Sequence, residues 1–135
     1  EPTLGLDLVY RKEFYSQLIE DYYDGEKTIL ISTHQVEEIE GVLSDAVFMN
    51  QGRIVMQDSI ESINKKFLEL RPNRDSLERA KSLRPIHQRV ELGREVLLFE
   101  DTEHEKLSDL GEVRPPFIAD LFMAIMDKTK NGDNA

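Results

Sequence analysis

Residues 28–35 read TILISTHQ, and this stretch decides the fold of the 135-residue chain. Its first four residues form a run of β-branched and aliphatic side chains, which predicts a strand over residues 27–33. Because the run does not alternate with polar residues, we expect it to be buried on both faces, as in a parallel sheet. A lone histidine, His34, follows the run. The stretch therefore predicts an α/β fold with His34 at the end of a strand.

Upstream of this strand, residues 1–7 read EPTLGLD and form a tight apolar loop. Asp7 suits the start of a helix, because its carboxylate can accept a hydrogen bond from a free backbone N–H group. The apolar spacing over residues 8–23 is helical, and Gly25 provides the usual stop. We therefore expect an amphipathic helix between the loop and the strand.

Downstream, the pattern predicts a short acidic helix over residues 36–43 and a strand over residues 45–50. A turn at Gly52, which can adopt a positive φ angle, is expected to return the chain antiparallel through residues 54–56. Ser59 is expected to cap the next helix. The region thus predicts a hairpin followed by a helix.

The character of the sequence changes at residues 72–74, where we expect a boundary between residues 1–71 and residues 72–135. Past this point the predicted elements are a weak helix over residues 76–82, a strand over residues 95–100, a short helix within residues 101–110 and a last helix after the prolines at 115 and 116. The apolar stripe of the last helix predicts a core contact or a self-association face.

Two motifs carry a likeness to a known family. Residues 1–7 resemble the junction of the Walker B glutamate and the D-loop in ATP-binding cassette (ABC) ATPases, and residues 31–35, ISTHQ, resemble the H-loop of that family. The resemblance implies the C-terminal part of a P-loop, ABC-type nucleotide-binding domain over residues 1–71. A small α+β extension, regulatory or for dimerisation, is then expected over residues 72–135.

The same resemblance implies roles for single residues. Glu1 would be the general base that orients the attacking water, and a solvated chain terminus is the alternative. His34 would contact the γ-phosphate, and a histidine satisfied at a strand end is the alternative. Leu4, Gly5, Leu6 and Asp7 would form the loop that couples two nucleotide-binding domains.

Each part of that loop also has a purely structural interpretation. The first three of its residues could simply make a buried turn. Asp7 could serve only as a helix cap, and this role is compatible with coupling because a cap fixes the loop that a partner contacts.

The sequence holds no GxxxxGK[ST] phosphate loop, no recognisable Q-loop and no LSGGQ-like signature. Consecutive N–H groups and a lysine of such a loop hold the phosphates of ATP, and its hydroxyl holds Mg²⁺. We therefore expect ATP and Mg²⁺ to bind the complete parent protein, and neither to bind this stretch alone. By resemblance, the parent would be an ATP-hydrolysing subunit that powers transport across a membrane. The alternative is a non-enzymatic regulatory or dimerisation module of such a subunit.

Composition limits the partners. The net charge of −10 disfavours binding to nucleic acid, whose phosphates are also negative. The carboxylates around His104 could bind a metal ion, but such runs are usually solvated turns, and we predict no metal site. The expected partners are a transmembrane permease, a second nucleotide-binding subunit and, for this stretch alone, a second copy of itself. The expected location is the cytoplasmic face of the cell membrane.

Overall fold

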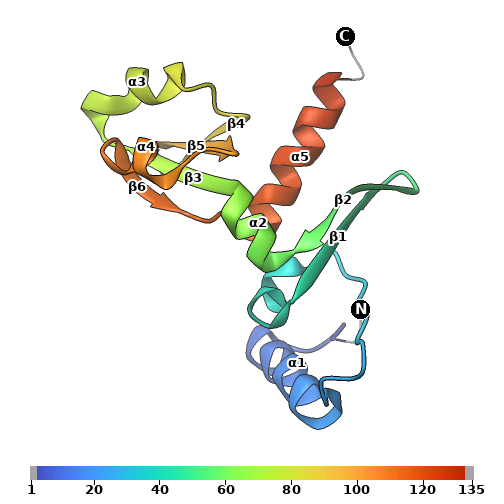
Figure 1. Cartoon of the computed structure of the whole chain (residues 1–135). Coiled ribbons are helices and arrows are strands. Elements are labelled where there is room, and N and C mark those ends of the chain that lie inside the picture. Colours follow the sequence, from blue (N-terminus) through green and yellow to red (C-terminus); the bar gives the residue numbers. More distant parts are fainter. Residues whose placement is uncertain (1–2, 133–135) are drawn as a thin grey trace. The chain divides into compact units, whose positions relative to one another are not determined.

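The computed structural model describes residues 3–132 and divides into two compact units, one ending at Ser44 and the other beginning at Asp45 (Figure 1). We call them the N-terminal unit and the C-terminal unit. Helices and antiparallel strands together make a mixed α/β fold. Within the described residues, every helix is too short or too polar to cross a membrane.

The N-terminal unit is built around helix α1, Leu8–Tyr22. Asp7 caps α1 as predicted, since its side chain accepts a hydrogen bond from the backbone N–H of Tyr10. Tyr15 is the buried residue of the helix. After a long connection come two 3-10 turns, η1 (Val36–Glu38) and η2 (Glu40–Val42), where the sequence predicted one short helix.

The predicted strand over residues 27–33 is wrong. These residues pair with no other described segment, and Leu30 is 90% exposed. A strand forms only where neighbours receive its N–H and C=O groups, and both sheets of the described chain lie between Asp45 and Arg114. The sheets are antiparallel, so the expectation of a parallel sheet is not met within residues 3–132.

The C-terminal unit begins with the predicted hairpin, β1 (Asp45–Asn50) and β2 (Arg53–Ser59). Both turn residues have positive φ angles, 49° at Gln51 and 74° at Gly52, as a type I′ turn requires. Helix α2, Ile60–Lys66, follows, and the predicted cap at its start is confirmed. The capping serine accepts a hydrogen bond from the N–H three residues along.

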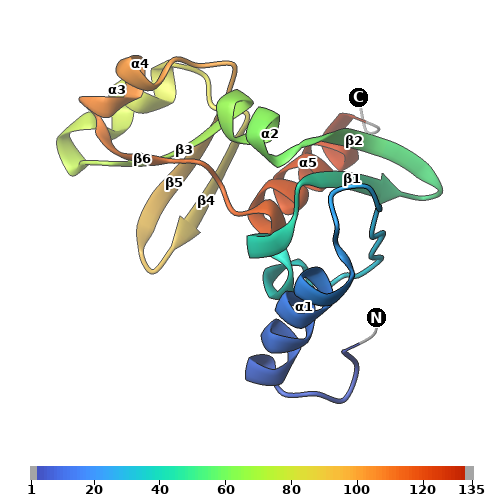
Figure 2. The same ribbon diagram turned by 60° about the horizontal axis from the view of Figure 1, so that its bottom comes forward.

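A second sheet has the strand order β4-β5-β3-β6, with every pair antiparallel. Its strands are β3 (Phe67–Pro72), β4 (His87–Glu91), β5 (Arg94–Glu100) and β6 (Gly111–Arg114). The helical turns between them are η3 (Arg74–Ser76), α3 (Leu77–Ser82) and α4 (His104–Ser108). Figure 2 shows α3 and α4 together on one side of this sheet. They cover a continuous apolar core formed by Leu68, Leu70, Ala80, Leu97, Phe99, Leu107 and Leu110.

The last helix, α5 (Ile118–Gly132), follows the two prolines as predicted. Its buried residues are Ile118, Leu121 and Ala124. The ring of Phe122 meets that of Phe48 from β1 edge to face, with ring centroids 5.2 Å apart. One side of the predicted apolar stripe is therefore core.

Strands β3, β4 and β6 were not predicted. Gly111 directly follows the predicted short helix within residues 101–110, and in the structure it begins β6 opposite Pro72. A Cβ at Gly111 would lie 2.2 Å from the backbone oxygen of Arg71, so the strands can approach only at a glycine. The predicted boundary between residues 71 and 72 falls inside β3. The assignment of residues 1–71 to the C-terminal part of a nucleotide-binding domain and of residues 72–135 to an extension stays a prediction.

Candidate functional site

The predicted coupling loop forms a tight turn in the N-terminal unit. The N–H of Leu6 donates to the backbone oxygen of Thr3 at 3.1 Å, and Gly5 between them has a φ angle of 90°. The purely structural interpretation of this loop required a buried turn. Its leucine side chains are instead exposed, Leu4 by 77% and Leu6 by 40%. The turn therefore presents two apolar side chains outward, while Asp7 caps α1.

Arg11, one turn into α1, joins this loop to the segment around His34. Its Nε donates to the backbone oxygen of Leu6 at 2.5 Å. Its Nη1 donates to Gln35 Oε1 at 3.0 Å and to Glu38 Oε1 at 2.5 Å. The guanidinium of Arg11 thus joins the loop that precedes its own helix to two residues that lie 24 and 27 positions after Arg11 in the sequence.

Glu38 is the buried acidic group of this arrangement, with a side chain that is 6% exposed. Its second oxygen accepts a hydrogen bond from the hydroxyl of Thr3 at 3.1 Å, and Thr3 itself is buried. The hydrogen bond from Arg11 is the main reason that the pKa of Glu38 lies below its ordinary value. The hydroxyl of Thr3 and the charges of Arg11 and His34 act in the same direction and outweigh the effect of burial. We call Thr3, Arg11, Gln35 and Glu38 the N-terminal polar cluster.

Of the two predicted catalytic residues, the structure describes His34 and not Glu1. His34 is exposed and directly precedes Gln35, a member of the N-terminal polar cluster. The hydroxyl of Thr33 accepts a hydrogen bond from the N–H of Gln35 at 3.0 Å, which shapes the backbone on both sides of His34. His34 is thus an exposed residue on a backbone that is held in place, near enough to Glu38 for its charge to lower the pKa of that carboxyl. Glu1 lies outside the described residues.

Sequence reasoning missed Thr3, Arg11 and Glu38. Arg11 lies within the predicted amphipathic helix over residues 8–23, and Glu38 lies within the predicted short acidic helix over residues 36–43. A usable signal existed, because a carboxylate buried next to a helix needs a cation, and Arg11 lies in the first turns of that helix. Which carboxylate would be buried could not be decided without the structure.

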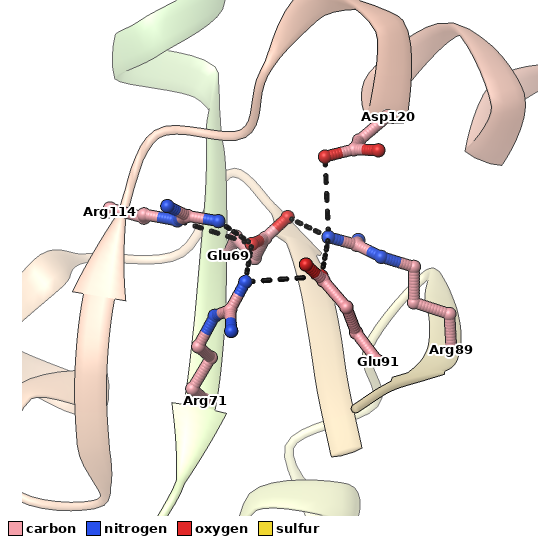
Figure 3. A network of polar contacts seen from close by, with 6 residues as sticks. All are labelled: Glu69, Arg71, Arg89, Glu91, Arg114 and Asp120. Carbon is pink, nitrogen blue, oxygen red and sulfur yellow. Dashed lines mark hydrogen bonds and ion pairs between the residues drawn. The ribbon is translucent and has the colours of Figure 1, made fainter. Parts of the chain in front are cut away.

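Figure 3 shows a second polar cluster, on the large sheet. Glu69 alternates along β3 with Leu68 and Leu70 of the apolar core, so the cluster lies on the sheet face opposite that core. Glu69 on β3 is fully buried and accepts hydrogen bonds from Arg89 Nη2 and Arg114 Nη2, both at 3.0 Å. Arg89 Nη2 also reaches Glu91 Oε2 at 3.2 Å and Asp120 Oδ2 of α5 at 3.4 Å. The members of this sheet-face cluster are Glu69, Arg71, Arg89, Glu91, Arg114 and Asp120.

The sheet-face cluster contains three arginines and three carboxylates, so its charges compensate one another. Burial disfavours the charge of Arg89, but Glu69, Asp120 and Glu91 together hold the pKa of Arg89 above its ordinary value. The hydrogen bond from Arg89 is likewise the main cause of a lowered pKa at Glu91. The cluster is suited to joining β4 and α5 to the sheet rather than to binding an ion.

His87, at the start of β4, lies beside α5. Its Nε2 is 3.2 Å from Asp127 Oδ2, and the pair lines an open hollow of about 390 Å³ together with Lys130. The described residues contain no group of three or more histidine, aspartate or glutamate side chains that could hold a metal ion.

Comparison with known proteins gives partial matches. The chain is 29% identical over 63 residues to the ABC transporter ATP-binding protein NatA of Bacillus subtilis, a match that covers 47% of this chain and 25% of NatA. It is 29% identical over 65 residues to the energy-coupling factor transporter ATP-binding protein EcfA2 of Acetivibrio thermocellus, covering 48% of this chain and 23% of EcfA2. It is 33% identical over 76 residues to the mouse ATP-binding cassette sub-family A member 6, covering 53% of this chain and 5% of that protein.

The matches therefore span a quarter or less of each of these relatives. No family model matches the chain. The chain is distantly similar to the ATP-binding subunits of ABC transporters.

Proposed function

We propose that the N-terminal unit is the D-loop and H-loop region of an ABC transporter ATP-binding subunit, which hydrolyses ATP to power transport. The N-terminal polar cluster carries this proposal. It ties the loop at residues 3–7 to the segment at residues 33–38 through Arg11, and these are the two segments that resemble the family's motifs. The similarity to NatA and EcfA2, both named as ATP-binding proteins, supports the same function.

In this proposal His34 donates a hydrogen bond to the γ-phosphate of ATP, and Glu1 accepts a proton from the attacking water. When bound, Mg²⁺ would neutralise part of the negative charge of the phosphates. The proposal requires the parent protein to have a phosphate loop that binds ATP and Mg²⁺, since these 135 residues do not contain that motif. Arg11 and Glu38 are positioning residues, because they hold the backbone beside His34 and do not meet the substrate.

Leu4, Gly5, Leu6 and Asp7 contact the second nucleotide-binding subunit in this proposal. The exposure of Leu4 and Leu6 supports the role, because apolar side chains that face water favour burial against a partner. The subunit acts with a transmembrane permease on the cytoplasmic face of the membrane. The net charge of −10 suits a permease that presents basic loops.

The test is ATP hydrolysis by the product of the complete gene, comparing His34→Ala with His104→Ala. His104 is also exposed but begins α4 in the other unit, so it controls for loss of an exposed imidazole. We expect His34→Ala to lower kcat by about 100-fold or more, as loss of one donor to a developing negative charge does. His104→Ala should leave kcat unchanged. Equal activity of the two variants would refute the role of His34.

A second candidate function is a non-enzymatic dimerisation or regulatory module. The observation that favours it is the apolar core of the C-terminal unit, which is closed by that unit's own helices α3 and α4. If the product of the complete gene neither binds nor hydrolyses ATP, only this candidate remains. Binding is measured as a rise in melting temperature with Mg·ATP.

A further inference from the structure

Strand β4 lies at an open edge of the large sheet, because β5 is its single partner among the described strands. Such edges are usually protected by charges, proline or a covering segment, since their free N–H and C=O groups can pair with another chain. Here the side chains that point away from the sheet-face cluster include Val90, which is 67% exposed. The turn that follows carries Leu92, which is 97% exposed.

Leu92 is unusual for a turn residue. It has a φ angle of 50° and is followed by Gly93 at 75°, so the two form the turn between β4 and β5 with both φ angles positive. Asparagine and glycine adopt this conformation readily, whereas leucine does so at a cost in free energy. An apolar residue kept in an unfavourable and fully exposed position points to a contact outside the chain.

We propose that β4 pairs antiparallel with β4 of a second copy of this chain, in a register centred on Val90. This register places Val90 opposite Val90 of the second copy. It also places Arg89 opposite Glu91 of the second copy, twice by symmetry, and Leu92 opposite Gln88. The three central positions are self-complementary, because Val90 faces Val90 and each charge faces its opposite.

The backbone fits this register. In a two-residue hairpin, the residues that flank the turn exchange hydrogen bonds with each other, and here they are Glu91 and Arg94. The hydrogen-bonded residues of β4 are then every second one, so the N–H and C=O groups of Val90 are directed away from β5. Two copies centred on Val90 can exchange a pair of hydrogen bonds there.

The charged side chains keep atoms free for the second copy. In their contacts with described residues, Arg89 uses Nη2 and Glu91 uses Oε2. The Nη1 of Arg89 and the Oε1 of Glu91 can thus form the new pair without loss of the sheet-face cluster. That cluster also holds β4 firmly in the sheet, so little ordering is needed on association.

This inference rests on the second candidate function, for which it names the surface and the partner, and it is independent of ATP hydrolysis. The first test is sedimentation velocity of the full chain across a concentration series. We expect dimers that Val90→Lys weakens by about tenfold or more, because two lysines then face each other. The matched control is Val47→Lys, the same change at an exposed site on β1. It should leave the dimer unchanged.

Mixing tests the register itself. At a protein concentration near the dissociation constant of the wild-type dimer, Val90→Lys and Val90→Glu should each be mostly monomeric alone. A 1:1 mixture should restore dimers, because residue 90 faces its own counterpart only in this register. A monomeric wild type would overturn the proposal. So would dimers that resist Val90→Lys, dimers lost equally with Val47→Lys, or a mixture that stays monomeric. Circular dichroism of each variant verifies that it is folded.

A cysteine provides an independent readout, since the chain has none of its own. Facing residues that exchange hydrogen bonds in an antiparallel pair have Cα atoms about 5.5 Å apart, within the range that a disulfide spans. Under mild oxidation Val90→Cys should form a covalent dimer, while Val47→Cys should not. Equal cross-linking of both variants would contradict the proposed pairing. ATP hydrolysis would be unaffected by either result, so the two proposals fail separately.

Discussion

The two units of this chain are stabilised by different means. Among the described residues, the buried apolar side chains of the N-terminal unit are Tyr15 and Ile39, and a buried ion pair between Arg11 and Glu38 joins its segments. The C-terminal unit instead encloses a continuous apolar core between a four-stranded sheet and two helices. Apolar burial is the main source of stability, so the C-terminal unit should be much the more stable of the two.

The largest effect that we expect from this comparison is a difference between the two units in their unfolding by urea. All four tyrosines lie within residues 1–44, so tyrosine fluorescence reports on the N-terminal unit alone, while circular dichroism is dominated by the C-terminal unit. We expect the fluorescence transition at a clearly lower urea concentration than the circular dichroism transition. Coincident transitions would show one cooperative unit and would contradict the comparison.

The second test concerns the buried charge of the C-terminal unit. Glu69→Gln should lower the free energy of unfolding by about 3 kcal/mol, because it leaves Arg89 and Arg114 without their shared buried partner. Glu61→Gln, at an exposed ion pair with Lys65, should leave the free energy of unfolding nearly unchanged. The loss should appear in the circular dichroism transition and leave the tyrosine transition in place.

The same contrast explains what the sequence could predict. Local signals worked in both units, since the caps at Asp7 and Ser59 and the turn at Gly52 depend on nearby residues. The run at residues 28–31 failed, because whether a strand forms depends on a neighbour and not on its own propensity. Strand β3 was missed for the opposite reason: Glu69 interrupts its apolar pattern and is buried only because two arginines reach it.

The candidate site was predictable in part. Motif resemblance pointed to His34 and to residues 4–7, and these segments prove to be joined in the structure by Arg11. Arg11 itself could not be selected, because a helix with several charged residues gives no sign of which one turns inward. The roles of Glu1 and His34 in hydrolysis stay predictions.

Acid offers a third test, directed at the N-terminal unit. The pKa of Glu38 is lowered in the folded chain, mainly by the hydrogen bond from Arg11, so the folded state binds the proton less readily than the unfolded state. The contribution of Glu38 to the free energy of unfolding is therefore complete above its unfolded pKa of about 4.3. That contribution is lost as the pH falls through the pKa of Glu38 in the folded chain. The tyrosine transition should shift to lower urea below about pH 4. Glu38→Gln should lower that transition at neutral pH and remove this part of its acid dependence.

The smallest expected effect concerns the strained turn of the C-terminal unit. At protein concentrations low enough to keep the chain monomeric, Leu92→Asn should raise the stability of that unit by about 1 kcal/mol, since asparagine tolerates a positive φ angle. Leu83→Asn, at an exposed leucine with a φ angle of −79°, should give no gain. Urea unfolding followed by circular dichroism measures both. A gain at both positions would mean that exposure, and not backbone strain, is the cause.

Hydrogen exchange of the complete gene product, with and without Mg·ATP, tests the central claim most directly. If the N-terminal unit carries the H-loop of an ATP-binding site, Mg·ATP should slow amide exchange over residues 28–38 and leave β3 and β5 unchanged. Unchanged exchange over residues 28–38 in the presence of saturating Mg·ATP, or slowing confined to the C-terminal unit, would contradict it.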